Sequence, residues 1–192
     1  MAKKVMVLLA EGFEEVEAIT PIDYLRRAGI EVYAVSIASG DDAFQVPGAH
    51  GVVLRADSTL HELTKERRVS ADFWDGVLLP GGIPGASNLA SSEPVSELVQ
   101  DMAAAGKLVA AICASPAVVL DPLGVLRGRR FTCFPGMESS VSGAQWSAEQ
   151  VVVDGNIITS RGAGTAGLWA IALIAHLTDP SIAQQIASAV LL

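Results

Sequence analysis

A cysteine ends a run of apolar residues in the segment AAICASP, which spans residues 110–116. Two small side chains, Ala111 and Ser115, lie two positions before and after Cys113. A nucleophile on a sharp strand-to-helix turn needs small neighbours at this spacing because the backbone folds back tightly, as in the G-x-S-x-G turn of hydrolases. If a helix begins near Ser115, its amino-terminal N–H groups lower the pKa of the thiol and favour the thiolate. The alternative is a small core cysteine, and the spacing alone leaves both interpretations open.

Two glycines end another apolar run, in the segment LLPGG at residues 78–82. Gly81 and Gly82 would let the backbone approach a ligand closely and present N–H groups to a developing negative charge. A plain turn is the simpler interpretation of this segment taken alone. The two glycines are therefore candidates for an oxyanion pocket only together with Cys113.

Several glutamates follow the first apolar run, in the segment AEGFEEVEAI at residues 10–19. Glu14 and Glu15 are typical of acidic residues that offset the dipole at the start of a helix. Glu17 differs because it lies at the edge of the apolar face of that helix. A carboxyl group turned inward there would be desolvated, would have a raised pKa and would be suited to proton transfer.

Apolar runs of strand length alternate along the chain with segments of helical period. Strands are expected at 4–10, 31–38, 74–82 and 108–113, and helices at 14–29, 59–66, 94–107, 115–124, 164–179 and 180–192. A hairpin is expected at 150–160, and a short hairpin or a loop insertion at 41–57. This alternation predicts an α/β fold, a parallel sheet sandwiched between helices with right-handed crossovers. Ligands of such sheets bind at the carboxyl ends of the strands, which is where the cysteine and the two glycines lie.

The composition bounds the class of protein. The chain has 192 residues, 51% of them hydrophobic, which fits one domain spanning 1–192 with a large core. A formal net charge of -8 disfavours binding to nucleic acid or to anionic membrane surfaces. The apolar run at residues 5–10 is too short for a signal peptide and no segment reaches the length of a membrane span, so we expect a cytoplasmic protein. Two cysteines without metal-ligand spacing predict free thiols and no bound metal.

Four segments in order, LLAEGFEEVEAITPIDYLRRAGIEV, VLLPGG, AAICASPAVVL and ITSRGAGT, together resemble the ThiJ/PfpI superfamily in its DJ-1 branch, including bacterial ThiJ-type members. The resemblance covers nearly the whole chain. It implies a flavodoxin-like parallel sheet, similar to that of class I glutamine amidotransferases, and usually a homodimer. It implies no cofactor.

The resemblance also assigns roles to individual residues. Cys113 matches the reactive cysteine on a nucleophile elbow, and Glu17 matches a protonated glutamate that donates a hydrogen bond to the thiolate. Gly82 and Ala114 match residues whose backbone N–H groups form an oxyanion-like pocket, with Gly81 beside them. Arg27 matches an arginine near the site and near the dimer contact.

The activities that the resemblance implies are cofactor-independent conversion of 2-oxoaldehydes such as methylglyoxal, as in glyoxalase III, and deglycation of their adducts, in protection against carbonyl and oxidative stress. The alternative is a redox-sensing or chaperone-like stress protein in which Cys113 is oxidised without turnover. An amidotransferase-like hydrolase is set aside because no His-x-Glu pair follows the cysteine.

This sequence departs from the family pattern at two positions. Ala114 stands where protease-like branches carry histidine, and Phe134 of the segment TCFP stands where some members carry histidine. Both departures argue against proteolysis, and no second base is visible. The sequence leaves open whether His50 reaches the site or solvent, and whether Cys133 resolves an oxidised Cys113 or only fills space.

Overall fold

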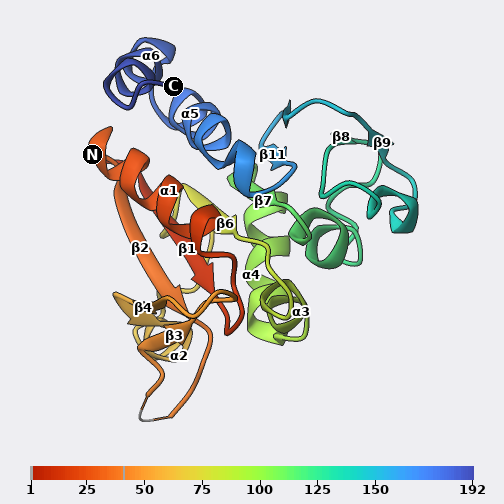
Figure 1. Cartoon of the computed structure of the whole chain (residues 1–192). Helices are drawn as coiled ribbons and strands as arrows, with labels where there is room; N and C mark the ends of the chain where they lie inside the picture. The colour runs from red at the N-terminus through yellow and green to blue at the C-terminus, as the bar shows by residue number, and fades with distance from the viewer. Residues whose placement is uncertain (1, 41) are drawn as a thin grey trace.

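Figure 1 shows a central sheet with helices packed on both faces, in a computed structural model that describes residues 2–40 and 42–192. Seven strands form the sheet in the order β10-β11-β7-β6-β1-β2-β5, and all neighbours pair in parallel except β10 and β11. Their bounds are β1 Lys4–Leu9, β2 Glu31–Ser36, β5 Ser58–Thr59, β6 Gly76–Leu79, β7 Leu108–Ile112, β10 Val151–Asp154 and β11 Ile157–Ser160. The predicted parallel sheet between helices is confirmed.

The central strands are buried on both faces because each face is covered by its own helices. In β1, Val5 and Val7 contribute to one hydrophobic cluster, and Met6 and Leu8 contribute to the other, as the period of two requires. The first face is covered by α1 (Glu15–Arg27) and α5 (Ala166–Leu177), and α6 (Pro180–Ala189) packs against α5. The second face is covered by α2 (Leu60–Lys65), α3 (Gly85–Ala90), α4 (Glu93–Ala104) and a five-residue π-helical turn at Pro116–Leu120.

Helix α1 carries the functional candidates at its first turn, so its placement decides the geometry of the site. Ala18, Ile22 and Leu25 are buried on its inner side and pack in the cluster shared with α5. The helix ends as predicted at a glycine, since Gly29 has φ of 76° just after the C-cap residue. This anchoring holds the first turn of α1 at the carboxyl ends of β1 and β6.

Short elements account for most of the differences from the sequence-based expectation. The hairpin of β3 (Gln45–Pro47) and β4 (Val53–Arg55) is antiparallel as expected, although residue 41 of the predicted range lies outside the described residues. Helix α3 was not predicted, nor was the small pair formed by β8 (Arg130–Phe131) and β9 (Gln145–Trp146). These elements are too short to carry a periodic signal.

In the part of the chain that the structure describes, no helix has the length and apolar character needed to cross a bilayer.

Candidate active site

Cys113 occupies a strained turn immediately after β7. Its φ is 63°, in the left-handed region that residues with a side chain rarely adopt. Its N–H donates to the carbonyl of Ser160 at 3.0 Å, and its own carbonyl accepts the N–H of Phe134 at 2.7 Å. Two hydrogen bonds from different segments therefore hold the strained conformation, and Cys113 lies on a sharp turn at the end of its strand, as the sequence pattern predicted.

Ser115 ties this elbow to the loop that follows β6. Its side chain is fully buried, and its Oγ donates to the carbonyl of Pro80 at 2.6 Å. The sequence pattern used Ser115 only as a small neighbour of the cysteine, and nothing local in the sequence reveals that its hydroxyl joins two strand ends.

The loop after β6 approaches the cysteine so closely that only glycine fits. A Cβ atom at Gly81 would lie 2.6 Å from Cβ of Cys113 and 2.7 Å from Oε2 of Glu17. Gly82 has φ of 87°, and a Cβ there would lie 2.5 Å from the backbone nitrogen of Glu14. Side chains are thus excluded from both positions. The N–H of Gly81 donates to Glu17, and the N–H of Gly82 faces the sulfur of Cys113.

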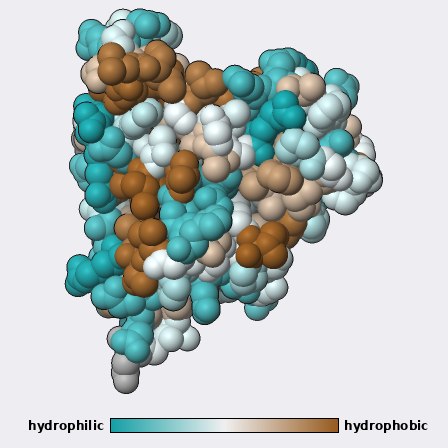
Figure 2. All heavy atoms as spheres, viewed as in Figure 1, coloured by the Kyte–Doolittle hydropathy of each residue, from teal (hydrophilic) through white to brown (hydrophobic). Residues whose placement is uncertain are grey.

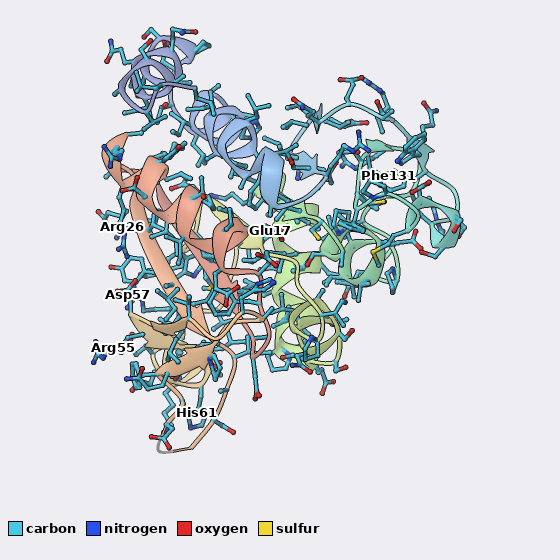
Figure 3. All side chains as sticks on the ribbon, viewed as in Figure 1. Glu17, Arg26, Arg55, Asp57, His61 and Phe131 are labelled. Carbon is cyan, nitrogen blue, oxygen red and sulfur yellow. The ribbon has the colours of Figure 1, made fainter. Side chains whose placement is uncertain are left out.

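Glu17 points from α1 toward the loops at the ends of β6 and β7, in the centre of the molecule (Figure 3). Its side chain is fully buried, and its Oε2 accepts the N–H of Gly81 at 2.8 Å. Its carboxyl group is also a hydrogen-bonding partner of the Cys113 thiol. Among the described residues, Oε1 of Glu17 has no hydrogen-bond partner, so one buried oxygen remains to serve a ligand or a proton.

The pKa values of Glu17 and Cys113 depend on each other. Burial raises the pKa of Glu17 from its ordinary value of 4.5 to about 7. Burial, and then the charge of an ionised Glu17, raise the pKa of Cys113 to about 12, although the backbone N–H groups of Gly82 and Ala114 act in the opposite direction. The predicted lowering of the thiol pKa is therefore wrong for a thiol beside an ionised Glu17. The helix that follows is a single π turn of five residues, and its N–H groups do not outweigh burial.

The two groups are best treated as a pair that shares protons. The pair releases its first proton near pH 7, because that is the lower of the two pKa values. Once one proton has left, the remaining proton can lie on the carboxyl or on the sulfur. With that proton on Glu17, Cys113 is a thiolate that receives the N–H groups of Gly82 and Ala114.

Arg27 lies at the far end of α1 from Glu17. Its Nε contacts Asp23 at 2.7 Å, and its side chain is 52% exposed. Figure 3 shows the neighbouring Arg26 near β2, well away from Glu17. Within one chain the structure brings Cys113, Glu17, Gly81, Gly82 and Ala114 together and does not bring Arg27 to them.

Glu15, expected from the sequence only to offset the dipole at the start of α1, is buried and makes specific contacts. Its Oε1 accepts the N–H groups of His50 at 2.7 Å and Val52 at 3.3 Å, and its Oε2 contacts Nδ1 of His50 at 3.0 Å. These hydrogen bonds outweigh desolvation and lower the pKa of Glu15 to about 2. His50 therefore contacts the first turn of α1, and its ring is 70% exposed. Glu14, Glu15 and His50 also lie close enough to hold a cation, but both oxygens of Glu15 are already occupied by these hydrogen bonds.

Cys133 and Phe134 lie next to the elbow with opposite exposure. Cys133 is 1% exposed, and burial raises the pKa of its thiol to about 11. Its side chain packs in the cluster on the second face of the sheet, which favours the space-filling interpretation. Phe134 is 50% exposed beside the site.

The fold is an α/β sandwich, and its strand ends carry a strained cysteine, a buried carboxyl group and converging N–H groups. This combination is typical of the class of proteins with a nucleophile elbow. The DJ-1/PfpI family model matches residues 3–176, and the chain belongs to this family. It is 35% identical over 193 residues to the Parkinson disease protein 7 homolog of Danio rerio, covering 99% of this chain and 97% of the relative. A deglycase of Pyrococcus abyssi is 35% identical over 168 residues, covering 86% and 94%.

Solved structures agree with this assignment. The structure titled Toxoplasma gondii DJ-1, oxidized, matches with a TM-score of 0.91 at 35% identity, covering 99% of this chain and 98% of the other. Some relatives are longer. The chain is 38% identical to Protein DJ-1 homolog B of Arabidopsis thaliana over 89% of its own length but spans 37% of that relative.

Proposed function

We propose that this chain is a cysteine-dependent enzyme that converts 2-oxoaldehydes of the methylglyoxal type to 2-hydroxy acids, or removes their adducts from other molecules, without a cofactor. The observation that carries the proposal is the contact of the buried Glu17 carboxyl with the Cys113 thiol at a site lined by the N–H groups of Gly82 and Ala114. A relative named a deglycase adds support.

The chemistry balances with these groups and one water molecule. The sulfur of Cys113 attacks the aldehyde carbon, and the new oxyanion accepts N–H hydrogen bonds before taking a proton from Glu17. Ionised Glu17 then removes the hydrogen from that carbon, and the proton returns to the neighbouring carbonyl carbon through an enediol. The product is a thioester of the 2-hydroxy acid. Water hydrolyses it, releasing the acid and restoring the thiol.

Turnover of methylglyoxal by the purified chain tests the proposal. The expected result is formation of lactate by the wild type and none above background by Cys113→Ala. Cys133→Ala is the matched control, since Cys133 is buried in the core, and it should retain activity. Equal activity of the wild type and Cys113→Ala would contradict the proposal.

A second candidate function is redox sensing without turnover. Cys113 is partly exposed whereas Cys133 is buried, so peroxide reaches Cys113 first. A sulfinate at Cys113 would accept the same N–H groups and a proton from Glu17. Absence of turnover together with selective oxidation of Cys113 would favour this function, with a chaperone-like role as its extension.

We also propose a homodimer that pairs through α1. Val16 and Ile19 are 48% and 40% exposed on this helix, and Val52 and Val53 of the neighbouring hairpin are 51% and 54% exposed. Figure 2 shows brown side chains interrupted by polar ones across this face. An antiparallel two-fold pairing of α1 would bring Arg27 of the partner subunit toward the first turn of α1, where Glu17 lies.

A further inference from the structure

A hollow of about 360 Å³ opens beside the catalytic candidates, and the proposed chemistry does not use it. Its lining includes Phe134 and Pro135 from the segment after β8, Gln150 just before β10, and Arg161, Gly162 and Thr165 from the turn after β11.

Hydrogen bonds fix the walls of this hollow relative to Cys113. The N–H of Phe134 donates to the carbonyl of Cys113 at 2.7 Å, so the aromatic wall starts at a fixed distance from the elbow. The opposite wall is a closed turn, because the hydroxyl of Thr165 accepts the N–H of Gly162 at 3.2 Å and contacts Oγ of Ser160 at 2.7 Å. Both walls are therefore built before any ligand arrives.

The hollow also adjoins the unsatisfied oxygen of the site. A Cβ atom at Gly162 would lie 3.6 Å from Cδ2 of Phe134 and 3.9 Å from Oε1 of Glu17. That oxygen is buried and has no partner among the described residues. Gly162 thus lies between the phenylalanine ring and Glu17, at the point where a substrate bound to Cys113 would extend.

The lining favours an apolar and flat group. The phenylalanine ring, the proline ring, an alanine and two glycines supply most of the lining. The polar residues of the lining are Gln150, Arg161 and Thr165. Nη1 of Arg161 donates to the carbonyl of Ala148 at 3.2 Å, and the Thr165 hydroxyl is occupied as described. A methyl group would leave most of this volume unfilled, whereas an aryl ring would contact Phe134 face-on or edge-on.

We propose that Phe134 is a specificity-determining residue, and that the hollow accepts the aryl or bulky apolar substituent of the compound whose carbonyl carbon reacts with Cys113. The substrate class, aryl-substituted 2-oxoaldehydes rather than methylglyoxal itself, rests on the proposed function. The hollow as a binding site for an apolar group next to Cys113 does not.

Alkylation of Cys113 tests the site without requiring turnover. The second-order rate constants for N-benzyl iodoacetamide and for iodoacetamide are measured by peptide mass spectrometry, and their ratio reports binding of the benzyl group. We expect the ratio to fall roughly tenfold in Phe134→Ala and to be largely kept in Phe134→Leu, which preserves apolar bulk. Phe73→Ala is the matched control, because Phe73 is 37% exposed and precedes the amino end of β6. An unchanged ratio in Phe134→Ala overturns the proposal.

Measurement of turnover is the second test of the proposal. The ratio of kcat/KM for phenylglyoxal to that for methylglyoxal should exceed one in the wild type and fall roughly tenfold in Phe134→Ala. Absence of all turnover with a shifted alkylation ratio would remove the enzymatic function and still support the binding site. Turnover of both aldehydes with neither ratio altered in Phe134→Ala would leave the enzymatic function standing and overturn the role of Phe134.

Discussion

Glu15 and Glu17 lie two residues apart in the first turn of α1, both are buried, and their pKa values move in opposite directions. Glu15 receives hydrogen bonds from His50 and Val52 and is held ionised. Glu17 receives the N–H of Gly81 but sits in a site where burial dominates, so its protonated form persists to about pH 7. One helix turn therefore presents a permanent charge on one side and a proton donor on the other.

The Glu17→Gln substitution separates positioning from proton transfer. Glutamine can still donate a hydrogen bond to a thiolate but cannot exchange a proton. We expect alkylation of Cys113 by iodoacetamide at or above the wild-type rate, because the charge of ionised Glu17 that raises the pKa of the thiol is removed, with 2-oxoaldehyde turnover lower by ~10²–10⁴-fold. Glu97→Gln, an exposed position on α4, is the control. Parallel loss of alkylation and turnover would mean that Glu17 only positions the cysteine.

The Glu15→Gln substitution should change the stability of the protein in acid. The folded protein holds Glu15 ionised down to about pH 2, whereas the unfolded chain binds a proton near its ordinary pKa of 4.5. The unfolded state therefore binds more protons in this window, and stability is lost as pH falls from 4.5 toward 2. We expect the slope of unfolding free energy against pH there to drop by up to one proton in Glu15→Gln, measured by urea unfolding. An unchanged slope would argue that Glu15 is not ionised in the folded state.

Glu17 changes the pH dependence of the unfolding free energy in the opposite direction to Glu15. Its folded pKa of about 7 lies above the ordinary value of 4.5, so its contribution is fully present below pH 4.5 and is lost as pH rises toward 7. In Glu17→Gln the decline of stability between pH 4.5 and 7 should be smaller than in the wild type. A wild-type slope retained in this variant would place the buried proton elsewhere.

The sequence predicted the strands and the elbow because both depend on local pattern. The apolar runs that became β1, β6 and β7 are continuous, and the small residues around Cys113 are within two positions of it. Glu17 could be inferred because its own helix period placed it at the edge of the apolar face. Glu15 could not, because its burial depends on a loop that lies 35 residues away in the chain and folds over it.

The thiol pKa was mispredicted for a related reason. The sequence pattern indicated the N–H groups of a helix start beside the thiol, but the length of the following helix and the burial of the sulfur depend on tertiary structure. The observed turn spans Pro116–Leu120, and both burial and the neighbouring Glu17 oppose ionisation of Cys113. Exposure, rather than a low intrinsic pKa, distinguishes Cys113 from Cys133.

Mild peroxide should oxidise Cys113 before Cys133. Cys133 is 1% exposed in the core, whereas Cys113 is partly exposed and receives N–H groups that stabilise a negative sulfur or its oxidised form. Peptide mass spectrometry over a peroxide titration measures the order. Preferential oxidation of Cys133 would contradict the assignment of Cys113 as the reactive cysteine.

Ser115→Ala should destabilise the protein and loosen the elbow. The substitution leaves the buried carbonyl of Pro80 without the hydroxyl that now donates to it at 2.6 Å, which costs about 1–3 kcal/mol. Ser91→Ala is the control, since Ser91 makes an equivalent bond to the carbonyl of Ser87 on an exposed helix end. Urea unfolding measures the difference between the two variants. Equal stabilities would mean that the Ser115 bond adds nothing beyond an exposed one.

We expect Arg27 to act across a homodimer. Light scattering should give twice the 19.9 kDa chain mass for the wild type, and Ile19→Asp should give a monomer that retains its circular dichroism.

Arg27→Ala should lower kcat/KM for 2-oxoaldehydes roughly tenfold through loss of a charged hydrogen-bond donor. Arg26→Ala is the control, because Arg26 is as exposed but pairs with Asp57. A heterodimer of Arg27→Ala with Cys113→Ala contains one site with its own Cys113 and the partner's Arg27. Because random exchange of equal amounts makes about half of the dimers heterodimers, mixing should raise activity to about a quarter of that of the wild type. A monomeric wild type, or no recovery on mixing, would show that Arg27 does not reach the site of the partner.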